Sequence, residues 1–320
     1  MKLVKQMMIL VIAMCLAAGA AANEYPSKPV KVIVPYTQGS ATDVLARMVG
    51  AKLSELWGQP VVVENLPGAG GSKGTAEVAK SSPDGYTLLV HSSSYAVNQA
   101  TYASLPYAKT DFVDIAPLAG QPFTLVASPS AGVKTVAQLI AAAKAKPGQM
   151  KYGSAGTGTS THLIAERFKS AAGIDVGHIP FKGGPQANAA TASGEVAFWF
   201  PPTAIAIKGV KAGKFLALGV SGVSRSVLLP DVPTITEAAI PGFEARVWWG
   251  MWAPAGIAAN VRDPLTKDVA RALAAPDLRA QLTQRGFESM SMTSAQFSRL
   301  IQDEVEAAAR TLKEAGLKPK

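Results

Sequence analysis

The sequence predicts an α/β protein of two lobes, each a mainly parallel sheet flanked by helices. Short apolar runs alternate with helical patterns through much of the chain, and strands that alternate with helices form parallel sheets covered by helices. The pattern becomes wholly helical after residue 261, and such a tail needs a sheet on which to pack. The length of 320 residues is that of about two domains.

The first part of the chain shows this alternation directly. Strands are expected at 30–34, 61–63 and 86–90. A helix is expected from about Thr42, because apolar residues recur at helical spacing up to Leu56. A short helix is expected to follow the glycine-rich segment 67–72 and to end near Lys80.

The middle of the chain repeats the pattern, and the tail then departs from it. Strands and helices are expected in alternation, with extended segments at 124–127, 178–181, 196–200 and 215–220, and helices at 136–145, 160–172 and beyond 261. Residues 152–154 lead into a glycine-rich turn, and the pattern changes after 246–253. If the tail packs on the N-terminal unit, the chain crosses between the lobes near residues 125 and 248. The first lobe then comprises 23–124 and 249–320, the second comprises 125–248, and the two crossings form a hinge.

The first 22 residues have the pattern of a secretory signal peptide. Lys2 and Lys5 precede an apolar run at 7–18, and the small residues 20–22 form a cleavage site. The run is too short to span a bilayer comfortably. A lipoprotein signal with Cys15 as the lipidated residue is the alternative, although the bulky Met14 stands before it. The mature protein is expected in the periplasm.

Composition and motifs exclude several function classes. With 48% hydrophobic and 17% charged residues, the chain is neither disordered nor an integral membrane protein. Its single cysteine excludes an intramolecular disulfide framework. The net charge of +9 falls to +7 without Lys2 and Lys5, and the remaining basic residues are scattered, which argues against nucleic acid. Histidines lie far apart and no phosphate-binding motif occurs, so neither a metal nor a cofactor is expected.

Three glycine-rich turns stand between a strand and a helix, at residues 38–40, 68–72 and 154–160. Glycine lets the backbone approach a ligand closely. The first N–H groups of a helix lack an internal acceptor and carry partial positive charge. Each turn is therefore a candidate anion site, to which hydroxyl groups would add donors at Ser40, Ser92, Thr157, Thr159 and Ser160.

The same residues also have purely structural explanations. The turns would simply cap their helices, and Asp43 would cap the free N–H groups of its own helix. His162 lies in the first turn of a helix, where it would contact a ligand or make a structural hydrogen bond. The late tryptophans are mostly expected in the core, although one or two rings beside the second crossing would line a pocket for an aromatic or flat ligand. The four late tryptophans are Trp199, Trp248, Trp249 and Trp252.

Several short segments, in order, carry a family resemblance over essentially the whole mature chain. They include Pro-Tyr-Thr-Gln-Gly-Ser-Ala-Thr-Asp at 35–43, Val-Glu-Asn-Leu-Pro-Gly-Ala-Gly-Gly at 63–71, Ser-Pro-Asp-Gly-Tyr-Thr-Leu at 82–88, Tyr-Gly-Ser-Ala-Gly-Thr-Gly-Thr at 152–159 and Leu-Pro-Asp-Val-Pro-Thr-Ile-Thr-Glu at 229–237. With these segments the chain resembles the extracytoplasmic solute receptors of tripartite tricarboxylate transporters, the Bug family.

The resemblance implies a two-lobed periplasmic binding protein of type II that closes on a small organic carboxylate and passes it to a tripartite tricarboxylate-type permease. It implies no catalytic residues. The implied ligand contacts come from the first strand–helix loop, the loop after the third strand and the Ser-Ala-Gly-x-Gly-Thr loop. We expect Tyr36, Gln38, Gly39, Ser40, Asp43, Ser92, Ser93, Tyr95, Ser154, Ala155, Gly156, Thr157, Thr159, Ser160, His162, Phe181, Phe200 and Pro201.

This chain departs from the family pattern at positions that bear on the ligand. Ser40 stands where the family often has a second glycine. Many relatives carry acids near the start and at the end of the strand at 196–200, where this chain has Ala197 and Pro201. An acid there can meet a ligand amino group. Its absence favours a non-amino carboxylate, such as an aromatic acid or a dicarboxylate, over an amino acid.

Two other functions stay open on the sequence alone. The protein would be a ligand sensor for a membrane signalling partner, which the receptor sequence cannot distinguish from a transport receptor. It would otherwise be a secreted hydrolase that uses Asp43 or His162, although the sequence shows neither a nucleophile elbow nor a paired nucleophile and base.

Overall fold

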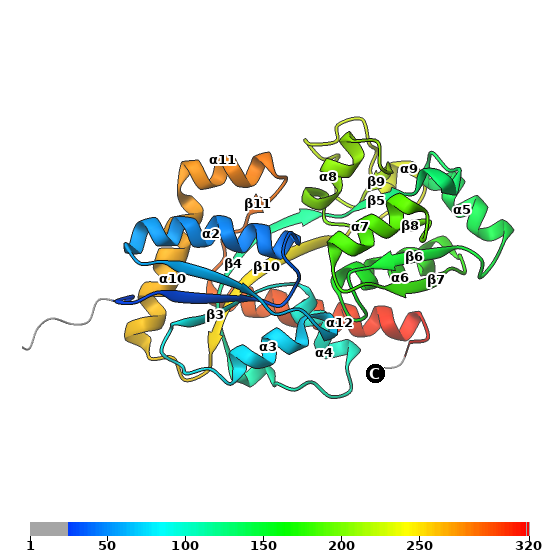
Figure 1. The fold of residues 1–320 in the computed structure, drawn as a ribbon. Coiled ribbons are helices and arrows are strands. Elements are labelled where there is room, and N and C mark those ends of the chain that lie inside the picture. Colours follow the sequence, from blue (N-terminus) through cyan, green and yellow to red (C-terminus); the bar gives the residue numbers. More distant parts are fainter. Residues whose placement is uncertain (1–24, 318, 320) are drawn as a thin grey trace, which may run out of the picture.

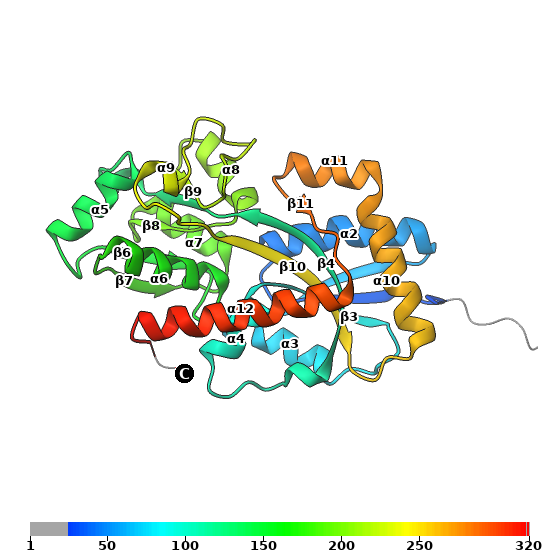
Figure 2. The same ribbon diagram turned by 180° about the vertical axis from the view of Figure 1, so that it is seen from behind.

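A computed structural model describes residues 25–317 and 319 of the chain, which form two lobes (Figure 1). Each lobe has a central β-sheet with helices on its faces. The view from behind shows helix α12 (Ser294–Glu314) running along both lobes (Figure 2). The predicted signal peptide, residues 1–22, lies outside the described residues.

The first lobe contains a six-stranded sheet in the order β11-β4-β10-β3-β1-β2. Strand β1 pairs in parallel with β2 and β3, whereas β10 runs antiparallel to β3 and β4. Edge strand β11 runs antiparallel to β4. The strands are β1 (Val30–Val34), β2 (Val61–Asn65), β3 (Thr87–Ser92), β4 (Phe112–Pro122), β10 (Arg246–Pro254) and β11 (Glu288–Ser289).

Helices cover both faces of this sheet (Figures 1 and 2). One face carries α2 (Ala41–Trp57), α10 (Ala259–Ala274) and α11 (Pro276–Gln284), which pack on one another. The other face carries α3 (Ser72–Ala79), α4 (Ser94–Thr101) and part of α12. Short 3₁₀ turns occupy Ala69–Gly71, Lys109–Asp111 and, in the second lobe, Pro129–Ala131.

The alternation of side chains along β10 explains why both faces are covered. Trp249 and Met251 pack into the core beneath α2 and α10, whereas Trp248 and Trp252 pack into a second core with Phe297 of α12. Successive residues of a strand point to opposite faces of the sheet. A strand with large apolar residues at both parities therefore needs a helical layer on each side.

The second lobe contains a five-stranded sheet in the order β7-β6-β8-β5-β9. Strand β6 pairs in parallel with β7 and β8, and β5 runs antiparallel to β8 and β9. Its elements are β5 (Thr124–Ala127), α5 (Val136–Ala145), β6 (Lys151–Ser154), α6 (Ser160–Ala172), β7 (Gly177–Pro180), α7 (Gly184–Ser193), β8 (Phe198–Trp199), α8 (Thr203–Lys211), β9 (Leu216–Val220) and α9 (Ile235–Ala238).

The chain passes between the sheets twice. It leaves the first sheet at the end of β4, enters the second as β5 two residues later, and returns after β9 to form β10. Strand β10 belongs to the first sheet from Arg246 onward. The lobe boundaries 124/125 and 248/249 stay a prediction. The C-terminal helices pack mainly on the first lobe, but α12 also contacts α6 of the second lobe.

The two-lobed α/β fold is confirmed, and the structure refines it in two respects. The sheets are mixed rather than mainly parallel, because β4, β5 and β10, which carry the chain between the lobes, all run antiparallel to their neighbours. The strand expected at 196–200 is reduced to Phe198–Trp199, since proline follows at positions 201 and 202 and cannot donate to a strand ladder.

Within residues 25–317 and 319, the helices are all too short or too polar to cross a bilayer.

Candidate functional site

A cavity lies between the two lobes. The space that protein atoms leave empty there, open solvent included, is about 430 Å³. The centre of a water molecule can occupy about 40 Å³ of it. That is room for roughly three waters. The cavity is lined by Tyr36, Ser40, Ala41, Thr42, Ser92 and Ser94 of the first lobe, Val247 and Trp249 of β10, and Ala155, Thr159, Ser160, Thr161, Gly184, Trp199, Pro202 and Ile205 of the second lobe.

Two helices from opposite lobes begin at this cavity. Ser40 caps α2, with its Oγ accepting the N–H of Asp43 at 3.2 Å. Thr159 caps α6 by accepting the N–H of His162. The next residues of each helix also line the cavity. Their N–H groups have no acceptor within the helix, and both helix dipoles place partial positive charge there.

A chain of hydroxyl groups crosses from the first lobe to the second. The Tyr36 hydroxyl lies 3.3 Å from Ser92 Oγ, which donates to Ser94 Oγ at 3.0 Å. Ser94 Oγ donates in turn to Ser160 Oγ at 3.3 Å. Burial raises the pKa of Tyr36 to about 12, which outweighs its hydrogen bonds from Ser92 and Ser94. Tyr36 is therefore a neutral hydroxyl at neutral pH.

Asp43 organises the first loop from behind rather than lining the cavity. Its carboxylate accepts hydrogen bonds from Gly39 N at 2.9 Å, from Asn65 at 3.0 Å and from Arg47 at 3.0 Å. Burial by itself would raise the pKa of Asp43, but these bonds and the Arg47 charge lower it. The structure thus agrees with a structural role at the helix start.

The glycine-rich loop of the second lobe is held by its own hydroxyl groups. Ser154 Oγ accepts the N–H of Gly156 at 3.1 Å and contacts His178 Nε2 at 2.7 Å. Thr161 Oγ1 accepts the N–H of Ala155 at 2.9 Å. Gly156 has φ = 129°, a backbone conformation that favours glycine. These contacts fix the conformation of the loop.

His162 belongs to a ring stack beneath this loop. Its ring lies 4.2 Å from that of His178, which lies 4.8 Å from Tyr152. His162 Nδ1 accepts the N–H of Gly158 at 3.4 Å. Burial raises the pKa of Tyr152, and the neighbouring Glu166, which accepts its hydroxyl proton in a short hydrogen bond, raises it further. His162 thus supports the loop and does not line the cavity.

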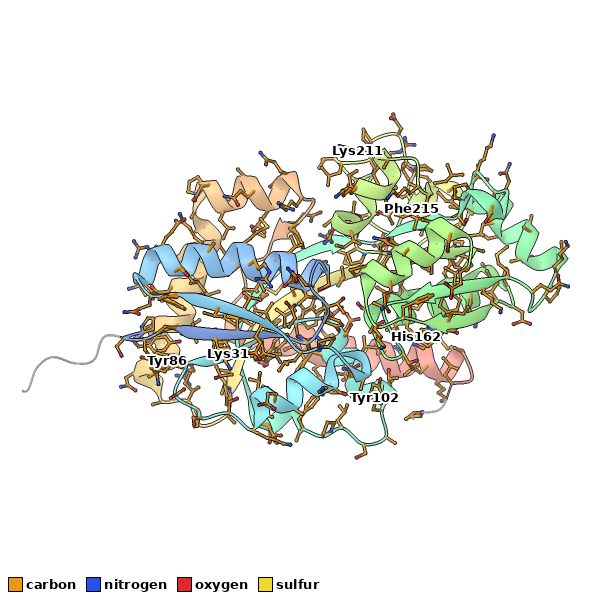
Figure 3. The ribbon with its side chains drawn as sticks, viewed as in Figure 1. Lys31, Tyr86, Tyr102, His162, Lys211 and Phe215 are labelled. Atoms are coloured by element: carbon orange, nitrogen blue, oxygen red, sulfur yellow. The ribbon has the colours of Figure 1, made fainter. Side chains whose placement is uncertain are left out.

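The lobes touch directly around the cavity rim. Tyr102, labelled at the boundary in Figure 3, donates from its hydroxyl to the carbonyl of Thr157 at 3.0 Å. A Cβ atom added at Gly158 would lie 2.7 Å from the Tyr102 ring, and one at Gly183 would lie 2.5 Å from Thr37 Oγ1. Glycine at these positions therefore allows the lobes to meet.

The structure brings together part of the expected ligand-binding set. Those that line the cavity are Tyr36, Ser40, Ser92, Ala155, Thr159 and Ser160. Those that support or flank its loops are Gln38, Gly39, Asp43, Ser93, Ser154, Gly156, Thr157, His162 and Phe181. Gln38 and Gly39 are exposed, and a Cβ atom added at Gly39 would lie 3.9 Å from Pro185 of the second lobe.

Three expected ligand contacts lie elsewhere. Tyr95 is fully buried among Tyr107, Phe112 and Trp252, and Phe200 packs on Phe168. The carbonyl of Pro201 accepts the N–H of Thr124. None of the three lines the cavity, because each belongs to the core or to a sheet edge rather than to a loop tip.

Other lining residues were missed by reasoning from motifs. Thr42 and Thr161 each follow a capping residue, Ser40 or Thr159, by two positions, and Ser94 begins a helix that the pattern did not predict. Pro202, Ile205 and Gly184 come from the starts of α7 and α8. Of the tryptophans, Trp199 and Trp249 line the cavity. The rings at 248 and 252 lie in the core.

Residues 25–317 and 319 contain no group of three or more His, Cys, Asp or Glu side chains arranged to hold a metal ion.

Comparison with known sequences identifies a family. The family described as "Tripartite tricarboxylate transporter family receptor" matches residues 45–317. A UPF0065 protein of Pseudomonas sp. strain P51 is 35% identical over 286 residues, which cover 89% of this chain and 85% of that protein. Protein BugT of Bordetella pertussis is 34% identical over 308 residues, covering 95% and 94% respectively.

Solved structures agree with this assignment. A protein of R. palustris solved with adipate superposes with a TM-score of 0.90 at 31% identity, covering 93% of this chain and all of that one. The periplasmic binding protein BugD gives a TM-score of 0.88 at 30% identity, covering 92% and 100%. MatC of Rhodopseudomonas palustris, solved with malate, gives 0.85 at 28% identity, covering 90% and 100%. Since the family match spans most of its length, the chain belongs to the tripartite tricarboxylate transporter receptor family.

Proposed function

We propose that this protein is a periplasmic receptor that captures a small organic carboxylate between its lobes and delivers it to a tripartite tricarboxylate-type permease. The observation that carries the proposal is the convergence of two helix N-termini, from opposite lobes, on one cavity. A carboxylate at such a place gains hydrogen bonds from free N–H groups and attraction from both dipoles.

The donors around the cavity suit reversible capture. They are backbone N–H groups and hydroxyls such as that of Ser160, all without charge. A buried lysine or arginine in the cavity would be left without a partner whenever the solute leaves, which is strongly unfavourable. Uncharged donors hold the anion and leave no such charge behind. The bound solute can therefore leave again when the receptor meets its permease.

Closure couples binding to the hinge. The two sets of donors meet only when the lobes are together, as the contact between Ser94 and Ser160 requires. A ligand held by both lobes therefore stabilises the closed state over the open one. The permease would recognise the loaded receptor because its lobes are closed, whereas those of the empty receptor open more readily.

The comparisons support the ligand class and the compartment. Two similar proteins were solved with adipate and with malate, both carboxylates, and BugD is a periplasmic binding protein. The family to which the chain belongs consists of receptors. We extend these properties to this chain, together with secretion through the predicted signal peptide.

A thermal-shift screen of organic acids tests the proposal. Ligand that binds only the folded state at 100 times its Kd adds about 2.7 kcal/mol of stability, which raises the Tm by on the order of 5 °C. We expect at least one carboxylate to give such a shift, while its amide or methyl ester gives none.

A matched pair of variants locates the site. Ala155→Leu places a larger side chain in the cavity wall and should abolish the shift. Ala171→Leu makes the same change on an exposed position of α6 and should leave the shift intact. If the purified protein converts the acid into another compound, or if both variants respond as the wild type does, the proposal is wrong.

A further inference from the structure

We infer that the solute carries only one charged group, its carboxylate, and that the rest of the molecule is uncharged and largely apolar, packed beside Trp199, Ile205 and Trp249. This inference rests on the proposed function and adds the class of acid that the cavity accepts.

The first argument is the absence of charge in the cavity wall. Within the described chain, the residues that line the cavity include no Asp, Glu, Lys, Arg or His. Tyr36, the one titratable group among them, has its pKa raised to about 12 by burial and stays neutral. An ammonium group on the solute would therefore lack an anionic partner.

The second argument is the uneven distribution of hydrogen-bond donors. Serine and threonine hydroxyls and two helix starts supply one part of the wall. The other part is built from large apolar residues whose donors are mostly used. Trp249 Nε1 donates to Thr42 Oγ1 at 2.9 Å, the N–H of Ile205 donates to the carbonyl of Pro202 at 2.9 Å, and proline has no N–H to give.

On that side, N–H groups that have no acceptor among the described residues remain at Trp199 and at the start of α7. The indole of Trp199 is fully buried, and among the described residues its Nε1 has no hydrogen-bond partner. Its Cη2 lies 3.6 Å from the position of a Cβ added at Gly184, the first residue of α7. Two neutral N–H groups suit one neutral acceptor, such as a hydroxyl or keto oxygen.

Two neutral donors do not suit a second carboxylate. An ionised carboxyl group has two oxygens and about four acceptor sites, and a buried charge that lacks enough hydrogen bonds is strongly unfavourable. Apolar rings and branched side chains instead favour a hydrocarbon or aromatic part of the solute.

Matched pairs of acids test this inference. Hexanoate and adipate have the same chain length and differ by an ω-carboxylate in place of a methyl group, and 4-methylbenzoate and terephthalate differ in the same way. Isothermal titration at pH 7.5, where all of these carboxyl groups are ionised, should show the monoacid of a binding pair at least 100-fold tighter than its diacid.

A substitution at the apolar part of the wall sharpens the test. Ile205→Arg adds a cation there and should shift the preference toward the diacid by at least tenfold. Ile207→Arg is the matched control, since Ile207 is on the same helix and half-buried but does not line the cavity. It should keep the wild-type preference.

The outcomes separate the two proposals. If wild-type protein binds diacids as tightly as the matched monoacids, the inference is overturned while the receptor function stands. If Ile205→Arg folds and its preference does not change, the apolar part of the solute does not lie beside Ile205 and the inference is likewise overturned. If no carboxylate binds at all, the proposed function itself fails. The wild-type comparison decides the matter even if Ile205→Arg does not fold.

Discussion

Ser94 Oγ accepts a hydrogen bond from the backbone N–H of Ser160 at 2.8 Å, although 66 residues separate them in the chain. Ser94 begins α4 in the first lobe and Ser160 begins α6 in the second. The bond therefore exists only when the lobes are together, and it lies in the wall of the cavity. It joins hinge closure to the geometry of the site.

Ser94→Ala should weaken ligand binding with little effect on the fold. One net hydrogen bond contributes about 1 kcal/mol, so the Kd should rise by roughly fivefold. Ser82→Ala, at an exposed position of the same lobe, is the control. Titration calorimetry that finds equal affinities for the two variants would contradict a role for Ser94 in closure.

Tyr102→Phe should shift the ligand-free protein toward the open form. The substitution keeps the ring but removes the hydroxyl that bonds to Thr157 across the rim. Tyr86→Phe is a matched control, because the Tyr86 hydroxyl contacts Ser27 within the first lobe. Small-angle scattering should give a larger radius of gyration for Tyr102→Phe alone, and an identical radius in both variants argues against the latch.

Gly183→Ala should hold the lobes apart. The new Cβ would lie 2.5 Å from Thr37 Oγ1 across the rim, far inside contact distance, but 3.6 Å from Thr37 Cβ. Affinity should therefore fall in Gly183→Ala and recover in the double variant with Thr37→Ala. A double variant as weak as the single one would mean that Gly183 acts within its own lobe.

Most elements were predictable because local patterns determine them. Helices α5 and α6 occupy the residues that the spacing indicates, and β1 does also. The long strand β4 was missed because it contains Pro117, Gly120 and Pro122, which usually mark loops. The register against β10 shifts where Gly250 faces Pro117, so an irregularity accommodates the proline.

Residues of the site could be predicted from the sequence only where they belong to the turn at the start of a helix. Ser40 and Thr159 stand at the starts of periodic helices, so their capping role is visible in the sequence. Ile205 and Val247 reach the cavity because of how the lobes close. That arrangement depends on contacts between residues far apart in the chain, such as Tyr102 and Thr157, which no local pattern specifies.

His91 should make the stability of the protein depend on pH in the acid range. Burial lowers the pKa of His91 to about 3, with its hydrogen bond to Ser92 opposing in part. An unfolded histidine binds a proton below about pH 6.5, so unfolding takes up a proton between these values. The free energy of unfolding therefore falls as pH falls through this window, by about 1.4 kcal/mol per pH unit, and is unaffected by His91 above it.

Urea unfolding at several pH values measures this contribution. His91→Asn removes the titrating group, so the variant should lose less stability than the wild type between pH 6.5 and pH 4.5. The quantity compared is the slope of the unfolding free energy against pH, which does not depend on the absolute stability of the variant. Parallel slopes would show that His91 is not kept neutral by the fold.

A crystal structure with the acid that gives the largest thermal shift tests the central claim most directly. We predict the carboxylate in the interlobe cavity, within hydrogen-bonding distance of N–H groups in the first turns of both α2 and α6, with the remainder of the acid against Trp199. A carboxylate bound to one lobe only, or held outside the cavity, would contradict the account.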